Sequence, residues 1–459
     1  MKGRSHSALF ADLYEVTMAR AYAAEGMSRT AVFELFFRQL PTSRNYVLAA
    51  GLSDVLEFLE SFHFDRDDLA YLRSLGLFPD EFLESLSAVR FTGDVFAALE
   101  GTIVFPNEPL VQVIAPILEA QLVETFVLNQ IHLQSVIASK AARVIAAARG
   151  RTVVDFGSRR AHGTDAALKV ARASYLAGAA GTSNLLAGRR YGIPVFGTMA
   201  HSFVQSFETE LAAFEAFARV YPTTTLLVDT YDTLAGVDHV IQLAQRLGER
   251  FDVRAVRLDS GELDTLSKAT RAKLDAAGLQ RVKIFASSGL DEHALAALLA
   301  NDSPIDGFGV GTALSLAADA PALDMAYKLV EYDGIGRTKL SSGKVIYPGR
   351  KQVFREISDG VFAGDTIGRF GEDLPGEPLL VPVMQSGRRL PDDAQGLDAA
   401  RNRARAQVEA LPARLRSLSP APAYPVHPSE RLALELERLS AALVARALAE
   451  RRSARLPAC

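Results

Sequence analysis

Hydrophobic and polar positions follow different patterns in three successive parts of the chain. In residues 1–150, short extended runs are mixed with segments in which apolar residues recur at every third and fourth position. The run 32–41 (VFELFFRQLP) predicts a strand, and the segments 52–62 and 123–135 predict helices. Residues 95–109 predict a short β-hairpin. The first 150 residues are therefore expected to form an N-terminal α/β domain.

The pattern changes between residues 151 and 330. Apolar, β-branched runs each end in a small or polar cluster, and a helical pattern follows each of them. Such units predict a parallel sheet, because parallel neighbours need a crossover helix. Their number favours an irregular, TIM-like α/β barrel, closed or nearly closed, and an open doubly wound sheet is the alternative. In either fold the polar clusters lie at the carboxyl ends of strands, where α/β folds bind ligands. The runs are 152–163, 193–202, 225–233, 253–262, 282–292 and 305–314.

After residue 330 the chain returns to short strands. Those between about 331 and 395 are expected to complete the N-terminal domain. Residues 417–430 hold four prolines and predict a semi-rigid linker. The segment 431–452 has the apolar spacing of an amphipathic helix and is expected to pack on its own domain, with a partner protein's helix as the alternative. Residues 396–459 are thus expected to form a C-terminal helical tail.

Composition and charge exclude several classes of function. Of the 459 residues 49% are hydrophobic, and 50 Lys and Arg nearly balance 54 Asp and Glu, so no bulk basicity argues for nucleic acid. The single cysteine, Cys459, excludes an internal disulfide framework and a Cys-based zinc site. Residues 1–22 lack the apolar core of a signal peptide, and no stretch is apolar enough to span a membrane. We expect a soluble, cytoplasmic protein with no nucleic-acid or membrane partner.

Two small-residue turns on late strands predict phosphate binding. They are ASSG at 286–289, which contains Ser288 and Gly289, and GFGVGT at 307–312. Without bulky side chains, backbone N–H groups can approach phosphate oxygens at the start of the following helix. A single glycine turn is often merely steric, but two on adjacent late strands resemble the phosphate site of many barrels.

Charged residues at other strand ends add candidate chemistry. Arg257 and Asp259 stand two apart, so both can face the mouth of the barrel, where a guanidinium binds a carboxylate or phosphate; a structural ion pair is the alternative. Asp229 and Asp232 are of the type that hold a Mg²⁺–polyphosphate, although each could simply cap a helix. His201 follows an apolar strand in a small-residue turn. The residues alone predict a barrel enzyme acting on a phosphorylated, Mg²⁺-bound, sugar-containing substrate.

A series of longer motifs makes a family resemblance specific. In chain order they are ADLYEVTMARAY, FELFFRQLP, DFGSRRAHG, GTMAHSF, VDTYDT, VRLDSG, SSGLDE, GVGTAL and YPGRKQVFR. With these motifs the chain resembles the nicotinate phosphoribosyltransferase family. The resemblance implies synthesis of nicotinate mononucleotide and pyrophosphate from nicotinate and 5-phosphoribosyl-1-pyrophosphate, coupled to ATP hydrolysis, as the first step of NAD salvage from nicotinate. It also implies Mg²⁺ as cofactor, ATP as co-substrate and a homodimer with a shared active site.

The resemblance also implies residue roles. His201 matches the histidine that ATP phosphorylates transiently, and Asp259 matches an aspartate on the ribose side, with Arg257 as the third catalytic residue. The nicotinate-binding positions, with the tyrosine reaching across the dimer interface, are Tyr14, Arg159, Ser183, Thr198 and Arg257. The positions for phosphoribosyl pyrophosphate are Ser288, Gly289, Gly309, Gly311, Thr312, Lys344 and Arg350, with Lys351 as a further anion ligand. Asp229 and Asp232 remain the metal positions expected from the residues alone, not from the resemblance.

The choice of pyridine depends on Ser183. Related nicotinamide phosphoribosyltransferases carry an aspartate at this position, and a carboxylate there would repel nicotinate, whereas serine is neutral. The acid is therefore expected as the substrate. Two alternatives stay open. One is a quinolinate phosphoribosyltransferase, whose dicarboxylate substrate would need a larger cluster of Arg and Lys. The other is a non-catalytic homologue, which is disfavoured by the presence of His201, Arg257, Asp259 and Thr312.

Overall fold

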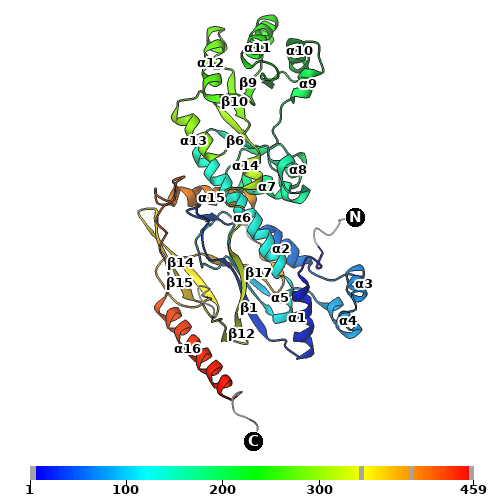
Figure 1. The fold of residues 1–459 in the computed structure, drawn as a ribbon, viewed down its shortest axis with the longest axis vertical. Coiled ribbons are helices and arrows are strands. Elements are labelled where there is room, and N and C mark those ends of the chain that lie inside the picture. The colour runs from blue at the N-terminus through cyan, green and yellow to red at the C-terminus, as the bar shows by residue number, and fades with distance from the viewer. Residues whose placement is uncertain (1–6, 341–345, 392–395, 454–459) are drawn as a thin grey trace. The chain divides into compact units, whose positions relative to one another are not determined.

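Contacts within the chain form two compact units in the computed structural model, which describes residues 7–340, 346–391 and 396–453 (Figure 1). Unit 1 combines Met1–Val136 with Ala322–Cys459, and unit 2 is the continuous stretch Ile137–Pro321. The first change of unit falls inside helix α6 (Glu124–Ala147), and the second comes shortly before strand β12 (Met325–Tyr332). The domain limits at 150, 330 and 396 stay predictions.

A seven-stranded antiparallel sheet lies at the core of unit 1, in the order β13-β12-β1-β5-β3-β17-β18. Its strand β1 (Thr30–Phe37) overlaps the segment 32–41 predicted as a strand, although it begins two residues earlier and ends at Phe37, and it is buried at every position after Thr30. Strands β12 and β17 come late in the chain and pair with the early strands β1 and β3, so later strands complete the N-terminal α/β fold as predicted. The other strands are β3 (Asp94–Ala98), β5 (Val111–Pro116), β13 (Ile335–Gly336), β17 (Leu380–Gln385) and β18 (Arg388–Arg389).

Short helices accompany this sheet. The helix predicted over 52–62 is α2, and the one predicted over 123–135 is part of α6. The bounds of the early helices are α1 (Leu13–Ala24), α2 (Leu52–Ser61), α3 (Arg66–Ser74), α4 (Asp80–Ala88) and α5 (Ile117–Leu122).

The hairpin predicted over residues 95–109 is wrong. The chain turns there, but β3 pairs with β5, whereas β4 (Ile103–Val104) pairs with β2 (Val47–Leu48) in a separate sheet. The reason is a buried anchor: the Glu100 carboxylate accepts the amide of Gly51 at 2.6 Å, and the amide of Gly101 donates to the Ala49 carbonyl at 2.8 Å. These non-local bonds replace the local pairing that the pattern suggested.

A second sheet of unit 1 contains the proline-rich segment. Its order is β16-β14-β15-β19, with β14 (Lys351–Ser358), β15 (Val361–Arg369), β16 (Glu377–Pro378) and β19 (Val426–Pro428). The buried Tyr424 stacks on Phe105 with ring centroids 3.9 Å apart, and its hydroxyl donates to Asp365 at 2.8 Å. Residues 417–430 therefore pack on the sheet and do not act as a spacer.

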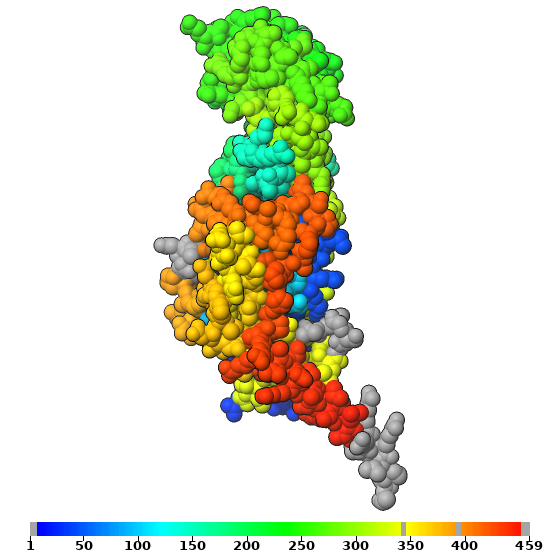
Figure 2. Space-filling view, turned by 90° about the vertical axis from the view of Figure 1, so that its left-hand side faces the viewer, coloured from blue at the N-terminus to red at the C-terminus, as the bar shows by residue number. Residues whose placement is uncertain are grey.

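Two late helices complete unit 1, α15 (Leu397–Ala410) and α16 (Glu430–Ser453). Leu432 in the first turn of α16 is fully buried against Val353 and Ile367, so the start of this helix packs on its own unit, as predicted. From Ala441 to Glu450 its side chains are mostly exposed, and Figure 2 shows this part of the helix at the surface in red. Within the described ranges no helix is both long and apolar enough to cross a membrane.

Unit 2 is built on a parallel sheet in the order β7-β6-β11-β10-β9-β8. Five of the six predicted runs form its strands, whereas the run 193–202 contributes only an isolated parallel bridge between Val195 and Thr182. The two-residue β7 was not predicted, because it is too short to leave a pattern. The strands are β6 (Thr152–Asp155), β7 (Gly181–Thr182), β8 (Thr225–Leu227), β9 (Ala255–Leu258), β10 (Lys283–Ser287) and β11 (Gly307–Val310).

The sheet is strongly curled. Thr225 at one end of the strand order and Phe196 beyond the other end line the same cavity of about 220 Å³. The α/β class is confirmed, whereas closure of the barrel stays a prediction, because no ladder among the described residues joins β8 to the segment of Val195. The crossover helices include α7 (Thr164–Leu176), α11 (Thr233–Leu247), α12 (Leu263–Ala276) and α13 (Glu292–Ala300).

A buried carboxyl on α1 makes the stability of the protein depend on pH. Glu15 is fully buried; burial raises its pKa from 4.5 to about 7, although hydrogen bonds from Thr125 and from the Asp12 amide oppose the shift. The folded chain therefore holds this proton more tightly than the unfolded chain does. The resulting stabilisation is complete below pH 4.5 and is lost as the pH rises through about 7.

We expect Glu15→Gln to remove this pH dependence, because the amide keeps the shape and does not titrate. Between pH 5 and pH 8 the free energy of unfolding of the variant should improve relative to wild type by about 1–3 kcal/mol. Urea unfolding of both proteins at the two pH values measures the change. A difference between variant and wild type that is the same at both pH values would contradict the assignment.

Candidate active site

Strands β6, β9, β10 and β11 end around one cavity of about 460 Å³ in unit 2. Three arginines and two aspartates line it, so its polar surface favours anions. The predicted site residues on its wall are Arg159, Arg257, Asp259, Ser288, Gly289, Gly309, Gly311 and Thr312. The sequence therefore identified most of the residues that make this cavity polar.

An ion pair lies at the end of β9. The Arg257 guanidinium donates from Nη2 to Oδ1 of Asp259 at 2.8 Å and from Nε to the Ser287 hydroxyl at 2.8 Å. Its face lies over the ring of Phe156, with 5.3 Å from Cζ to the ring centroid. Burial alone would raise the pKa of Asp259, but the Ser287 hydrogen bond, the charge of Arg257 and His201 together lower it, so this group is a carboxylate.

His201 continues this network. Its Nε2 lies 3.6 Å from Oδ2 of Asp259, and its Nδ1 lies 3.2 Å from the Thr230 hydroxyl. The imidazole is partly exposed and is the first residue of the short helix α9 (His201–Gln205). The structure thus brings His201, Arg257 and Asp259 together, and links them to the cavity that Thr312 also lines.

The two predicted phosphate turns lie side by side at the ends of β10 and β11. Ser288 has φ +82° and Gly289 has φ +62°, so two consecutive residues adopt the left-handed conformation that turns backbone N–H groups toward one side. The N-terminus of α13 is already capped, because Oδ1 of Asp291 accepts the amides of His293 and Ala294. The turn, rather than the helix terminus, therefore leaves backbone N–H groups open toward the cavity.

Asp155 organises the loop that follows β6. Its buried carboxylate accepts the amide of Gly157 at 2.7 Å and the Thr182 hydroxyl at 2.8 Å, and burial raises its pKa. The carbonyl of Asp155 also accepts the amide of Ser183 at 2.9 Å. One residue therefore fixes both the loop that carries Arg159 and the loop that carries Ser183.

Sequence reasoning missed Phe156 and Ser287. Phe156 lines the cavity beneath Arg257, and it also lines the smaller cavity inside the sheet. The sequence did hold a signal for Phe156, because this aromatic residue lies directly between Asp155, the last residue of β6, and Gly157. Ser287 lies inside the ASSG turn that predicts phosphate binding, but nothing in that motif indicates that its side chain lies between Arg257 and Asp259.

Asp229 and Asp232 differ in their fit to a metal. Oδ2 of Asp229 accepts the amide of Asp259 and the Ser260 hydroxyl, whereas its Oδ1 is buried and has no hydrogen-bond partner among the described residues. Oδ1 of Asp232 accepts the Ala235 amide and caps α11. A carboxylate oxygen left open is what Mg²⁺ can use, so Asp229 fits the predicted role better than Asp232. Groups of three or more metal-ligating side chains are absent from the described ranges.

Other predicted residues lie outside the 460 Å³ cavity. Thr198 lines the smaller cavity with Phe156, and Ser183 is exposed at the end of β7. Tyr14 is exposed on α1 of unit 1. Lys344 lies outside the described residues.

The two basic residues at the start of β14 behave differently. Lys351 is buried and pairs with Glu34 at 2.8 Å, while its ammonium donates to two backbone carbonyls at 2.7 Å. The prediction that Lys351 binds an anion is therefore wrong, because its three N–H groups are already used. Arg350 lies between the rings of Phe96 and Phe370, with Cζ 4.2 and 3.4 Å from their centroids, and burial lowers its pKa.

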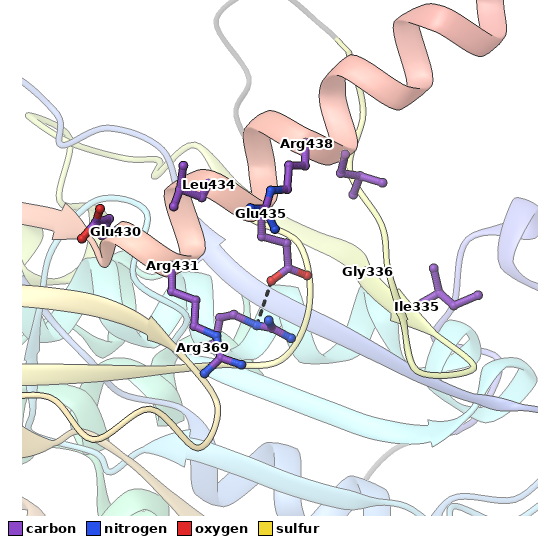
Figure 3. A pocket seen from close by; sticks show the side chains of 9 residues that line it. Ile335, Gly336, Arg369, Glu430, Arg431, Leu434, Glu435 and Arg438 are labelled. Atoms are coloured by element: carbon purple, nitrogen blue, oxygen red, sulfur yellow. Dashed lines mark ion pairs between the residues drawn. The ribbon is translucent and has the colours of Figure 1, made fainter.

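A larger groove, of about 810 Å³, lies in unit 1 between α16 and β15. Figure 3 shows Arg369 of β15 paired with Glu435 of α16 at 2.7 Å, with Arg431 and Arg438 beside them. None of the predicted site residues that the structure describes lines this groove. The guanidinium of Arg369 is neutralised within the chain by Glu435. The cavity of unit 2 is therefore the candidate active site.

Comparisons with known proteins point to one family. The family model for the nicotinate phosphoribosyltransferase N-terminal domain matches residues 9–132, and the model for the nicotinate phosphoribosyltransferase family matches residues 152–336. The chain is 74% identical over 438 residues to nicotinate phosphoribosyltransferase pncB2 of Mycobacterium tuberculosis, covering 95% of each chain. It is 44% identical to nicotinate phosphoribosyltransferase of Bacillus subtilis, covering 81% of this chain and 78% of the relative.

Solved structures show the same fold. The crystal structure of human nicotinic acid phosphoribosyltransferase matches with a TM-score of 0.82 and 31% identity over 93% of this chain and 99% of that one. A nicotinate-nucleotide pyrophosphorylase from Pyrococcus furiosus matches with a TM-score of 0.72 and 25% identity, over 89% and 99% of the two chains.

The packing at Gly309 yields a prediction. A Cβ there would lie 2.5 Å from the Phe156 ring and 3.1 Å from the Phe285 ring. We expect Gly309→Ala to displace Phe156 and to lower the free energy of unfolding by about 1–3 kcal/mol. Gly197→Ala is the matched control, because a Cβ at Gly197 meets no atom within 4 Å. Denaturant unfolding measures both, and equal stability of the two variants would show that the ring packing is not tight.

Proposed function

The chain belongs to the nicotinate phosphoribosyltransferase family, and we propose that it is itself a nicotinate phosphoribosyltransferase, which makes nicotinate mononucleotide and pyrophosphate from nicotinate and 5-phosphoribosyl-1-pyrophosphate. The observation that carries the proposal is the single cavity in which a guanidinium, a carboxylate and two small-residue turns meet. Both substrates are anions, and the arginines on the cavity wall suit them.

The phosphate end of the donor would bind at the turns after β10 and β11. The left-handed pair Ser288–Gly289 and the small residues Gly311 and Thr312 leave backbone N–H groups accessible to phosphate oxygens. Arg159, on the loop after β6, lines the same cavity and keeps its proposed place at the nicotinate end. Gly309 allows the close approach of Phe156, which sets the floor of the cavity.

The nicotinate end would bind at Arg257. Ser287 and Asp259 occupy its Nε–Nη2 edge, so the Nη1–Nη2 edge can take the carboxylate of nicotinate in a bidentate pair. Phe156 beneath the guanidinium offers a face to the pyridine ring. Ser183 and Thr198, on neighbouring loops, carry no charge and so leave the carboxylate unopposed.

The chemistry needs charge stabilisation more than proton transfer. The pyridine nitrogen attacks C1 of the ribose as pyrophosphate leaves, and positive charge develops on the sugar ring. The carboxylate of Asp259 is suited to stabilise that charge, and its lowered pKa keeps it ionised at neutral pH. The arginines on the cavity wall would stabilise the negative charge that develops on the leaving pyrophosphate.

We further propose that ATP phosphorylates His201 and that this step is coupled to synthesis. His201 is partly exposed, and its two nitrogens lie close to Asp259 and Thr230. A phosphoryl group on the imidazole adds negative charge beside Asp259, and this charge connects the state of His201 to the substrate cavity. Hydrolysis of the phosphohistidine then returns the free histidine and phosphate.

Mg²⁺ is the cofactor that we propose. Asp229 would hold it through the buried oxygen that has no partner among the described residues, and Asp232 is available only at the oxygen that does not cap α11. When bound, Mg²⁺ neutralises charge on the pyrophosphate group. Asp229 in turn supports the loop after β9 through the Asp259 amide and the Ser260 hydroxyl.

A cytoplasmic homodimer with a shared active site is also proposed. Phe10, Leu13 and Tyr14 are exposed together at the start of α1, and Leu185 and Leu186 are exposed on α8 (Leu185–Tyr191). Exposed apolar groups of this size favour a protein interface. In such a dimer Tyr14 of a second copy would cover the pyridine ring.

The reaction itself is tested by assaying mononucleotide formation with nicotinate, nicotinamide and quinolinate, each with phosphoribosyl pyrophosphate and Mg²⁺. We expect nicotinate to be the preferred substrate. Release of CO₂ from quinolinate would instead favour the decarboxylating enzyme, and no product with any pyridine would favour a non-catalytic homologue.

The histidine is tested by His201→Ala. We expect the variant to lose acid-labile phosphate from labelled ATP and to lose ATP stimulation of synthesis, while some ATP-independent synthesis remains. His427→Ala, which removes an exposed histidine of unit 1, is the control and should keep both. ATP stimulation that survives His201→Ala would show that another group accepts the phosphate.

The shared site is tested by mixing two variants of low residual activity, Tyr14→Ala and Arg257→Ala. If each site takes its tyrosine from one copy and its arginine from the other, mixed dimers hold one intact site. Unfolding and refolding an equal mixture should then restore about a quarter of wild-type activity. Activity no higher than that of the separate variants would contradict a shared site.

A further inference from the structure

Ser287 is the last residue of β10 and is almost completely buried, with 2% of its surface exposed. Its hydroxyl accepts a hydrogen bond from Nε of Arg257 at 2.8 Å and donates one to Oδ1 of Asp259. A hydroxyl has a single proton, and here that proton is committed to the aspartate while a lone pair serves the arginine. The side chain is therefore bonded on both sides and cannot rotate without losing a partner.

The sheet register explains why this residue sits there. Phe285 and Ala286 of β10 pair with Arg257 and Leu258 of β9, so the next residue, Ser287, comes beside Asp259. On its other side Ser287 pairs with Gly309 of β11, which has no side chain. The only polar side chains that the neighbouring strands offer to Ser287 are thus the two members of the ion pair.

The consequence for Arg257 is geometric. A guanidinium is planar, and hydrogen bonds from Nε and Nη2 along one edge, together with Phe156 beneath its face, fix the plane of the group. The edge formed by Nη1 and Nη2 is then presented to the cavity. Without the Ser287 acceptor, Nε–H would need another partner, and the plane could turn.

The consequence for Asp259 is also geometric. Its Oδ1 accepts from both Ser287 and Arg257, so the second oxygen, Oδ2, is left facing Nε2 of His201 at 3.6 Å. The same hydroxyl therefore sets the rotation of the carboxylate beside the histidine and the plane of the guanidinium in the cavity.

We propose that Ser287 is a positioning residue that holds the nicotinate-binding edge of Arg257 and the histidine-facing oxygen of Asp259 in one fixed relation. The proposal rests on the proposed function, because it concerns how the nicotinate-binding group, Arg257, and the carboxylate beside His201, Asp259, are held relative to each other. Ser287 itself does not touch the reacting atoms.

The test uses three substitutions in the full-length protein, Ser287→Ala, Ser287→Cys and Ser287→Thr. Alanine removes the hydroxyl, cysteine keeps the size but bonds weakly, and threonine keeps the hydroxyl. We expect kcat for ATP-independent synthesis to fall about tenfold to a hundredfold in the alanine and cysteine variants, since small misplacements of this kind have effects of that size. The threonine variant should recover most of the loss.

A packing role gives a different order. If Ser287 only fills space, cysteine should match wild type and alanine alone should be impaired, which would overturn the proposal. Ser267→Ala is the matched control, because Ser267 is also fully buried and its hydroxyl donates only to the Asp264 carbonyl, in α12. Its kcat should stay within about twofold of wild type, as for a substitution away from the site.

Two readouts show through which partners Ser287 acts. In an Arg257→Ala background, adding Ser287→Ala should lower ATP-independent synthesis by less than about threefold, because the group that it positions is gone. In an Asp259→Asn background, adding Ser287→Ala should leave the amount of acid-labile phosphate from labelled ATP within about twofold. If Ser287→Ala lowers the readout by the same factor in both of these backgrounds as it does in wild type, the proposal is wrong.

Wild-type protein in the same assays separates the two levels of inference. If wild type makes no nicotinate mononucleotide, the proposed function fails. If wild type is active and Ser287→Ala equals it in kcat and in phosphorylation, the proposed function stands and the positioning role of Ser287 is wrong. Thermal unfolding of each variant checks that a loss of activity is not a loss of fold.

Discussion

A charge taken partly out of water must find its partners within the chain, and at the mouth of the unit 2 sheet this constraint falls on Asp259. It accepts hydrogen bonds from Arg257 and Ser287 on one oxygen and approaches His201 with the other, while its amide is held by Asp229. These partners come from the ends of β9 and β10 and from the loops after β7 and β8. If the carboxylate were left unpaired, burial alone would raise its pKa. The geometry of the predicted catalytic groups follows from satisfying this one charge.

Asp155, the last residue of β6, fixes loops at another strand end of the same sheet. Its buried carboxylate is shared between the amide of Gly157 and the hydroxyl of Thr182, so two loops that are separate in sequence are tied to one strand end. Gly157 has to be glycine, since a Cβ there would lie 2.0 Å from the Ser315 hydroxyl. The two aspartates together explain how short strands of two to five residues hold polar loops in fixed positions.

Much of unit 2 could be predicted because parallel strands leave a strong local pattern, and their polar ends lie on one edge of the sheet. That rule predicts that Arg257, Asp259, Ser288 and Gly311 lie close together, and all four line one cavity. It failed where the deciding contact is far away in sequence.

The failures have a common physical cause. The predicted hairpin at 95–109 gave way to bonds from Glu100 and Gly101 to residues 49–51, and Lys351 was lost as an anion ligand because Glu34, three hundred residues earlier, neutralises it. Neither partner leaves a trace in the local sequence.

The position of β12 late in the sequence has a consequence for biosynthesis. Strand β1 is almost wholly apolar, yet one of its edges waits for β12, about 300 residues further along, while the continuous stretch of unit 2 is made in between. At roughly 5–20 residues per second, that edge stays unpaired on the nascent chain for roughly 15–60 s, and an unpaired apolar edge of this kind is exposed to wrong pairing during translation.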